Sequence, residues 1–310
     1  MGTLIVDRKG ASLKLQRKAI TVHENGEYRT SIPLSHIDRI IICNNTQIGT
    51  NLLGAAAENG IAFTVIDSRN PQKSSQMYPV KRTDVQRRLN QYVLATAGTN
   101  AEQWSAILIR KKLQKQRRLL QNALKQRADK RKYLLTAIQR IADGEKSLKA
   151  AKTAETIRGI EGAAARAYFA GYGQLFAPAL NFNGRNRRPP RDPVNAILSL
   201  SYTMAHKEAV IAIIKAGLDP MLGFYHTPEH SRESLACDLI ELIRPDIDKW
   251  AWQQFKQKTL RADHFKTDAG GCFLGKAGRE QYFPNWEIFA RTLRKQLKRY
   301  SYIIVRMLQR

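Results

Sequence analysis

Acidic residues are scarce in this chain of 310 residues, and long hydrophobic runs are lacking. Asp and Glu number 26 against 52 Lys and Arg, which gives a formal net charge of +26. An excess this one-sided favours polyanionic partners, either nucleic acid or an anionic membrane surface, over a surface that is basic only for solubility. A membrane role is disfavoured, because no apolar run approaches the roughly 20 residues that a bilayer requires.

Cysteine is sparse as well, with three residues, Cys43, Cys237 and Cys272, spread along the chain. Their separation excludes the spacing of a zinc site and indicates free thiols in a cytoplasmic protein. The first residues, MGTLIVDRKG, follow a strand-like pattern and do not resemble a signal peptide. No Ser-His or Cys-His signature of a covalent nucleophile is present, and we find no internal repeat or low-complexity tract.

Short β-type runs dominate residues 1–80. They occupy residues 4–6, 12–15, 19–22, 29–32, 40–43 and 61–66. The sequence Glu24-Asn25-Gly26-Glu27 predicts a hairpin turn between two of these runs. Residues 50–58 predict a short helix, and residues 67–76 a loop or linker. We therefore expect a small β-rich domain over residues 1–80, which needs its neighbour or a second copy for stability.

Residues 81–310 follow a helical pattern, so the predicted fold class is α+β, with a small N-terminal β-rich domain and a larger all-α C-terminal domain. An apolar stripe runs from Trp104 to Ile141, and Asp143-Gly144 is expected to end it. The positions between are basic: Arg110, Lys111, Lys112, Lys115, Arg117, Arg118, Lys125, Arg127, Lys130, Arg131 and Lys132. We interpret them as a track for a phosphate backbone, with a simply solvated helix face as the alternative.

Residues 223–245 carry the most informative pattern, GFYHTPEHSRESLACDLIELIRP. His226 follows a Gly-Phe-Tyr turn, and Asp238 and Glu241 lie three residues apart on a predicted helix, so their carboxylates share one face. One nitrogen donor and two oxygen donors could hold a divalent metal, which beside so much positive charge indicates phosphodiester chemistry on nucleic acid.

Glu161 is a further candidate, in the Gly- and Ala-rich helix predicted over residues 156–175. A carboxylate on a buried, small-residue helix is costly unless it is paired or bound to a metal. The alternative is a glutamate that faces solvent beside the packed face.

Residues 181–195 predict a stiff, cationic loop, because four arginines and three prolines are concentrated there. Asp192-Pro193 has the pattern of a helix N-cap followed by proline at the first helical position, so a helix is expected over residues 194–216. Either the loop only caps this helix, or it contacts DNA. The candidates for DNA contact here and near His226 are Arg185, Arg187, Arg188, Arg191, Asn195 and Arg232.

Three segments resemble the CRISPR adaptation integrase family, the metal-dependent nuclease subunit that inserts new spacers into a CRISPR array. They are GIEGAAARAYF at 159–169, RNRRPPRDPVNAILSLSY at 185–202 and GLDPMLGFYHTPEHSRESLACDLIELIRP at 217–245. Residues 32–67 and 270–283 resemble further parts of the same family. The order and spacing also agree, so the resemblance covers nearly the whole chain.

The resemblance implies a β-domain followed by an all-helical catalytic domain. It implies that Glu161, His226 and Glu241 are ligands of Mn²⁺ or Mg²⁺, with Asp238 as an additional catalytic acidic residue. The chain departs from the family pattern at Ser231, where glycine is usual, and at Cys237 and Leu242, where aliphatic and acidic residues are usual. None of these changes removes a ligand.

The resemblance also implies a reaction and partners. The reaction joins the 3′-hydroxyl ends of new spacer DNA to the CRISPR repeat by transesterification, so double-stranded DNA is the substrate. The partners are a second copy of the chain, bound through the β-domain, and a small second adaptation subunit that completes a hetero-hexameric complex. Three alternatives remain open from the residues: a structure-selective metal-dependent nuclease without integration, a non-catalytic nucleic-acid-binding module, and a basic scaffold without metal.

Overall fold

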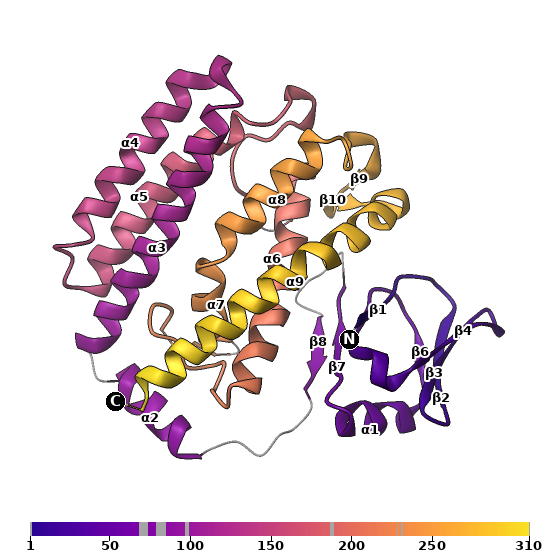
Figure 1. The fold of residues 1–310 in the computed structure, drawn as a ribbon. Coiled ribbons are helices and arrows are strands. Elements are labelled where there is room, and N and C mark those ends of the chain that lie inside the picture. The colour runs from indigo at the N-terminus through magenta and orange to yellow at the C-terminus, as the bar shows by residue number, and fades with distance from the viewer. Residues whose placement is uncertain are drawn as a thin grey trace. The chain divides into compact units, whose positions relative to one another are not determined.

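The computed structural model describes residues 2–67, 74–78, 85–96, 99–186, 189–227, 229–230 and 232–309. The chain divides into two compact units, Met1–Thr83 and Asp84–Arg310. The first unit is rich in strands and the second is mainly helical (Figure 1). The α+β class expected from the sequence is therefore confirmed.

The first unit contains two four-stranded sheets in its described residues, with strand orders β1-β5-β7-β8 and β4-β3-β2-β6. In the first sheet β1, β5 and β7 are parallel, and β8 is antiparallel to β7. The elements are β1 (Gly2–Val6), β2 (Ala11–Gln16), β3 (Ala19–Glu24), β4 (Glu27–Pro33), β5 (Ile37–Ile42), β6 (Gln47–Ile48), α1 (Thr50–Glu58), β7 (Ala62–Val65) and β8 (Ser75–Met77).

The turn between β3 and β4 forms where the sequence predicts it. Asn25 and Gly26 have φ angles of 52° and 89°, so both central residues are left-handed, as a two-residue type I′ hairpin turn requires. Asparagine and glycine tolerate this conformation better than other residues, which is why the Asn-Gly pair predicted the hairpin. Strands β6 and β8 were not predicted, because each has only two or three residues.

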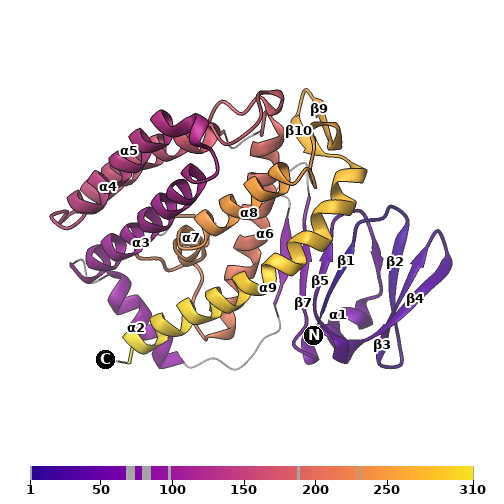
Figure 2. The same cartoon turned by 45° about the horizontal axis from the view of Figure 1, so that its top comes forward.

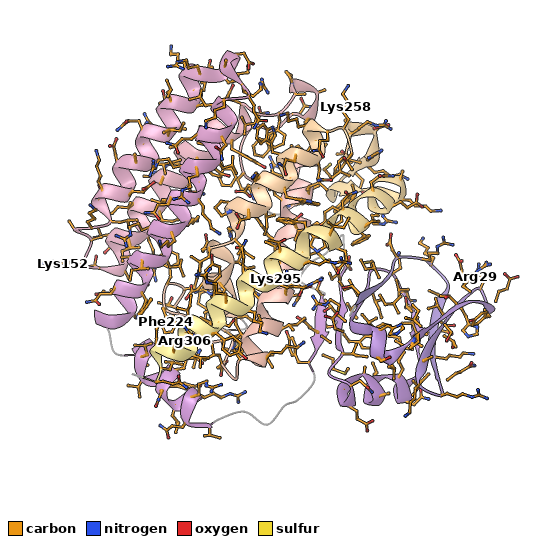
Figure 3. All side chains as sticks on the ribbon, viewed as in Figure 1. Arg29, Lys152, Phe224, Lys258, Lys295 and Arg306 are labelled. Atoms are coloured by element: carbon orange, nitrogen blue, oxygen red, sulfur yellow. The ribbon has the colours of Figure 1, made fainter. Side chains whose placement is uncertain are left out.

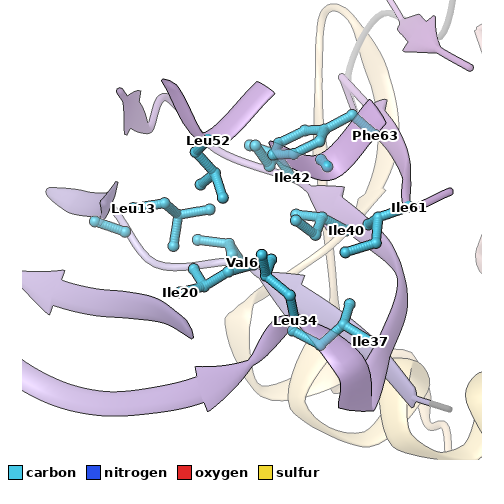
Figure 4. Packing of buried hydrophobic residues seen from close by; sticks show 12 residues of the cluster. Val6, Leu13, Ile20, Leu34, Ile37, Ile40, Ile42, Leu52, Ile61 and Phe63 are labelled. Carbon is cyan, nitrogen blue, oxygen red and sulfur yellow. The ribbon is translucent and has the colours of Figure 1, made fainter. Parts of the chain in front are cut away.

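The core of the first unit lies between the two sheets and α1. Val6 and Ile40 from one sheet pack with Leu13 and Ile20 from the other and with Leu52 of α1 (Figure 4). Each of these side chains is at most 5% exposed. Burying one such side chain stabilises the fold by about 1.5–3 kcal/mol, so this cluster contributes most of the stability of a small unit.

The second unit packs its helices in two groups. Helices α3, α4 and α5 lie side by side, and α6 lies among α7, α8 and α9 (Figure 1 and Figure 2). The elements are α2 (Val85–Thr96), α3 (Thr99–Leu124), α4 (Arg131–Ser147), α5 (Ala154–Gly173), α6 (Pro193–Lys215), α7 (Ser234–Glu241), α8 (Arg244–Lys256), β9 (Phe265–Asp268), β10 (Gly271–Leu274) and α9 (Lys276–Met307). The β9–β10 hairpin corrects the expectation of an all-helical unit.

Helix α6 begins as predicted, with the Asp192 side chain accepting a hydrogen bond from the Asn195 N–H at 2.8 Å. Within the described residues it is the one helix long and apolar enough to cross a membrane, which the sequence reading did not anticipate. Its buried residues occupy all sides, and it packs against α7, α8 and α9. A helix that is apolar all round is typical of a protein interior, so α6 is the central helix of this unit.

One expectation for the preceding helices is wrong. Helix α4 continues through Asp143-Gly144 to Ser147. Here α4 packs against α3 and α5, and a Cβ atom at Gly144 would make ordinary contacts with Leu113 Cδ1 at 3.4 Å and Ile160 Cγ2 at 3.5 Å. Packing thus overrides the low helix propensity of glycine.

The basic positions of α3 are not a uniform track. Lys115 forms an ion pair with Asp246 at 2.8 Å, and Arg117 pairs with Glu145 at 2.7 Å. Lys112 is 5% exposed. Of the basic residues on α3, Lys111 and Arg118 remain exposed, so the helix presents part of its positive charge to solvent and uses the rest in ion pairs.

Candidate active site

Asp238 organises the loop that carries His226. Its carboxylate is 1% exposed and accepts hydrogen bonds from the backbone N–H groups of Phe224, Tyr225 and His226, at 2.6, 3.0 and 2.9 Å. The His226 ring donates a fourth from Nδ1, at 2.7 Å. A buried carboxylate is stable only when its oxygens are satisfied, and four donors satisfy this one. Helix α7 therefore fixes the loop mainly through Asp238, and the Ser234 hydroxyl adds a bond to the Thr227 carbonyl at 3.1 Å.

The contact with Asp238 determines which nitrogen of His226 is available. Because an ionised carboxylate only accepts hydrogen bonds, we assign the proton to Nδ1 and the lone pair to Nε2. The ring packs edge-on against Tyr225, with centroids 4.9 Å apart, and the side chain is 25% exposed. Histidines that ligate metals are commonly oriented in this way, by a carboxylate on the other nitrogen.

Gly223 is required by the close approach of this loop to α7. A Cβ atom there would lie 2.8 Å from Asp238 Oδ2, 2.8 Å from the Ser234 carbonyl carbon and 2.9 Å from the His226 carbonyl oxygen. We expect Gly223→Ala to lower the free energy of unfolding by about 1–3 kcal/mol, because backbone atoms must shift to admit the methyl group. Chemical denaturation measures this loss.

Gly159→Ala is the matched control for this prediction. Gly159 lies in α5, and a Cβ atom there would meet nothing within 4 Å. The control should be neutral or stabilise the protein by about 0.5–1 kcal/mol, as alanine does in an exposed helix. Equal stability of Gly223→Ala and the wild type would contradict the steric argument.

Glu161 of α5 and Glu241 of α7 are brought together around a lysine of α3. The Lys112 ammonium lies 2.5 Å from Glu161 Oε1 and 2.5 Å from Glu241 Oε2. The Lys112 and Glu241 side chains are 6% and 5% exposed, and that of Glu161 is 21% exposed. The two carboxylates predicted as ligands therefore meet, with one shared cation between them.

Glu241 is held ionised by its surroundings. Burial alone would raise its pKa, but the charges of Arg244 and Lys112 outweigh burial and lower the pKa to about 2. Arg244 Nε lies 3.1 Å from Glu241 Oε1, so each oxygen of this carboxylate has a cationic neighbour. A carboxylate that stays charged is the form that can ligate a metal ion.

The residues fit a divalent metal by their chemistry. Carboxylate oxygens suit Mg²⁺, and an added imidazole nitrogen also suits Mn²⁺. Burial raises the pKa of Tyr225, the charges of Glu161 and Glu241 raise it further, and its ring packs against that of His226, so the imidazole and both carboxylates belong to one site. Within the described residues no three His, Cys, Asp or Glu side chains already enclose an ion position. A positive charge nevertheless lies between two of the predicted ligands, namely the Lys112 ammonium.

A buried polar network continues from Arg244 into the protein. The Arg244 guanidinium stacks over the Tyr202 ring, 4.8 Å from its centroid. The Tyr202 and Tyr168 hydroxyls donate to the two oxygens of Asp248, Tyr168 at 2.8 Å. Burial raises the pKa of Asp248 to about 6, although these hydroxyls and nearby Arg244 lower it.

Asp248 gives the protein a dependence of stability on pH. Its folded pKa of about 6 exceeds the ordinary value of 3.8, so the folded state binds the proton more tightly. The stabilisation is fully present below pH 3.8 and is lost as pH rises through about 6. For Asp248→Asn, unfolding free energies at pH 4 to 7 should lack this decline, which amounts to roughly 3 kcal/mol. Parallel pH profiles of variant and wild type would refute the assignment.

The loop before α6 is held by Asn195, which is fully buried. Its amide nitrogen donates to the Gly184 carbonyl and to Asp192 Oδ2, and its oxygen accepts from Arg185 Nη1 and the Asn186 N–H. These four bonds use the full hydrogen-bonding capacity of the amide. Asn195 therefore anchors the loop within the protein, and its contact with DNA stays a prediction.

The candidate DNA-binding arginines differ in placement. Arg185 also donates to Ser199 and stacks over Tyr202, and Arg232 pairs with Glu229 at 2.7 Å. Both are thus engaged within the protein, whereas Arg191 is exposed. Arg187 and Arg188 lie outside the described residues.

Sequence reasoning missed Lys112 and Arg244 as parts of the site. A helical face could have revealed Lys112, because it follows Ile109 by three residues and precedes Leu113 and Gln116, all of which are buried. A lysine on a buried face needs a carboxylate partner. The sequence gives no means of choosing which carboxylate.

The protein thus has a strand-rich unit followed by a helical unit. The helical unit carries one site with a histidine and three acidic residues, which is the donor set of a metal-dependent enzyme. Residues 4–288 match the family described as CRISPR associated protein Cas1. The chain belongs to this family, and the resemblance seen in the sequence is confirmed.

Relatives and solved structures agree with this assignment. CRISPR-associated endonuclease Cas1 1 of Thermodesulfovibrio yellowstonii is 36% identical over 296 residues, which cover 93% of this chain and 91% of the relative. A Cas1 protein from Thermotoga maritima has a TM-score of 0.86 at 19% identity, covering 99% of this chain and 97% of the other.

Two further structures share the fold. A casposase bound to its integration product has a TM-score of 0.83 at 18% identity, covering 99% of this chain and 91% of that one. The Cas6-RT-Cas1–Cas2 complex contains a chain with a TM-score of 0.85 at 18% identity, covering 99% of this chain and 35% of that one. At such identities the likeness concerns the fold alone.

Proposed function

We propose that this protein is a metal-dependent integrase of CRISPR adaptation, which joins 3′-hydroxyl ends of spacer DNA to the repeat by transesterification. The observation that carries the proposal is the meeting of Glu161 and Glu241 around a cation, beside the oriented His226. The curated relative named an endonuclease and the casposase bound to its integration product support this reaction type.

The roles of the residues follow from their contacts. Glu161, Glu241 and the Nε2 atom of His226 would hold Mn²⁺ or Mg²⁺, and Asp238 orients the imidazole from its buried position. When bound, the ion would neutralise charge on the attacked phosphate and activate the attacking hydroxyl or steady the leaving oxygen. Arg244 positions Glu241 through the pair at 3.1 Å. The attacking group belongs to DNA, so no covalent enzyme intermediate is required.

Affinity for DNA comes from the basic surface. Exposed cations of the helical unit lie on α9, at Lys295 and Arg306, and in the connecting segments, at Lys152 and Lys258 (Figure 3). Because such contacts release counterions from DNA, binding should weaken as salt rises. Arg191 is the exposed, described arginine of the loop before α6, and we assign it a phosphate contact. Asn195 and Arg185 hold that loop in place.

The proposal includes an assembly. A homodimer would form through the strand-rich unit, and a small second adaptation subunit would complete a hetero-hexamer. The solved Cas6-RT-Cas1–Cas2 complex supports such a partner. This assembly would act on the DNA of a prokaryotic cell, in the cytoplasm.

A strand-transfer assay tests the proposal. Protein with the small partner subunit is mixed with a duplex bearing free 3′-hydroxyls and a supercoiled plasmid bearing a repeat, in Mn²⁺, Mg²⁺ or EDTA. Joined product in the metal lanes alone is expected. Cleavage without joining would instead identify a structure-selective nuclease, and DNA binding without any product would identify a binding module.

A further inference from the structure

Lys112 is an unusual residue to find at a metal centre. It is 5% exposed on α3, beside Ile109 and Leu113, which are fully buried. Burying an ammonium group is costly unless opposite charge is close. Here two carboxylates lie 2.5 Å away, and they are the same two that the proposed function assigns to the metal.

The charges at the site show why this lysine matters. Without a cation, Glu161 and Glu241 would be two like charges at close range in a partly dehydrated place, which is unfavourable. Arg244 balances Glu241 through Oε1, and Lys112 balances both glutamates through Glu241 Oε2 and Glu161 Oε1. Lys112 is thus the cation that joins the two carboxylates.

We propose that Lys112 is an exchangeable counter-cation of the metal site, whose ammonium joins Glu161 to Glu241 in the metal-free protein and withdraws when a divalent ion binds. This inference rests on the proposed function, because it takes the two glutamates to be metal ligands. It assigns to Lys112 a positioning role that acts through the carboxylates.

The ammonium and a metal ion exclude each other on steric and electrostatic grounds. Carboxylate oxygens bind Mg²⁺ at about 2.0–2.1 Å. An ion held by Glu161 and Glu241 would therefore compete with the Lys112 ammonium, whose nitrogen lies 2.5 Å from an oxygen of each carboxylate. The positive charges of the ammonium and the metal ion would also repel each other strongly if both lay between the two carboxylates.

Lys112 is the cation that can leave. The Arg244 guanidinium is planar, pairs with Glu241 and stacks on the Tyr202 ring at 4.8 Å, so it is held by two contacts. Lys112 carries its charge on a flexible four-carbon chain. The site is more open toward Glu161 and His226, whose side chains are 21% and 25% exposed, than toward Glu241.

The exchange has a measurable consequence. A site closed by its own lysine binds metal more weakly than an open one, in proportion to the small fraction of open molecules. Replacing Lys112 by methionine keeps the apolar stem and removes the charge. If the Lys112 ammonium lies between the two glutamates in roughly nine molecules of ten, the apparent Mn²⁺ affinity of the wild type is reduced about tenfold. The full-length Lys112→Met protein should therefore bind Mn²⁺ about tenfold more tightly or better.

The experiment measures Mn²⁺ binding by the loss of the free-ion signal in electron paramagnetic resonance, on metal-stripped protein. Lys115→Met is the matched control on α3, because Lys115 pairs with Asp246 and not with the glutamates; its Mn²⁺ affinity should equal that of the wild type. Lys112→Arg should bind Mn²⁺ no more tightly than the wild type, since a guanidinium holds carboxylates by two parallel bonds. Lys112→Arg keeps the positive charge between the two glutamates, so it still tests the exchange if Lys112→Met fails to fold.

The outcomes separate the inference from the proposed function. Tighter Mn²⁺ binding in Lys112→Met, with binding lost in Glu241→Gln, supports both. Equal affinity in wild type and Lys112→Met, again with loss in Glu241→Gln, overturns the exchange and leaves the metal site standing. Absence of saturable Mn²⁺ binding from all of these proteins overturns both. A purely structural lysine would lower the melting temperature in its variants without raising the affinity.

Discussion

Replacing Glu161 by glutamine is expected to abolish metal-dependent strand transfer while leaving the protein folded. The glutamine keeps the shape of the side chain but loses the charge that a divalent ion requires. The loss should be at least about 10³-fold in rate, because a metal contributes several kcal/mol to a phosphoryl transition state. The fold should survive, since the Glu161 side chain is 21% exposed and Lys112 retains Glu241 as its partner.

Glu155→Gln is the control for this variant. Glu155 is exposed and lies in the first turn of the same helix, α5, so the two variants have the same change of net charge. It should join DNA at the wild-type rate. Salt-dependent DNA binding, measured separately, should be similar in both variants. A Glu161→Gln protein with more than a tenth of wild-type joining would exclude Glu161 from the metal site.

Replacing Asp238 by alanine should produce the largest loss of stability at the site. Three backbone N–H groups, of Phe224, Tyr225 and His226, would lose their acceptor in a buried place. Each unsatisfied group costs about 1–3 kcal/mol, so the free energy of unfolding should fall by about 3–5 kcal/mol in urea denaturation. Joining activity should fall too, because Nδ1 of His226 is released.

Asp246→Ala provides the comparison. Its carboxylate is 31% exposed and pairs with Lys115, so its loss should cost no more than about 1 kcal/mol. If Asp238→Ala were as stable as this control, Asp238 would not be the centre of the loop. Asp238→Asn should be intermediate, since its oxygen can still accept while its amide group faces N–H donors.

Local signals were sufficient for much of the fold. The Asn25-Gly26 pair specified the β3–β4 turn through its left-handed backbone, and Asp192-Pro193 specified the start of α6. The three-residue spacing of Asp238 and Glu241 placed both on α7. Such features depend on a few neighbouring residues, so they can be read without knowing the tertiary structure.

Features that depend on distant contacts were not accessible in the same way. Gly144 looked like the end of a helix, yet it is an interior residue of α4, which packs against α3 and α5. Lys112 looked like part of a solvent-facing track, because its carboxylate partners lie 49 and 129 residues further along the chain. Asp238 looked like a possible ligand, but its four donors make it the acceptor that organises the histidine loop.

The site is assembled from helices that are made at different times. Lys112 and Glu161 belong to α3 and α5, whereas Glu241 and Arg244 belong to α7 and α8. A nascent chain that has emerged only as far as α6 therefore has one of the three proposed metal ligands and lacks the other two. A chain truncated just before α7 contains Glu161 and His226 but still lacks Glu241, so the donor set for cutting or joining DNA is completed only late in synthesis.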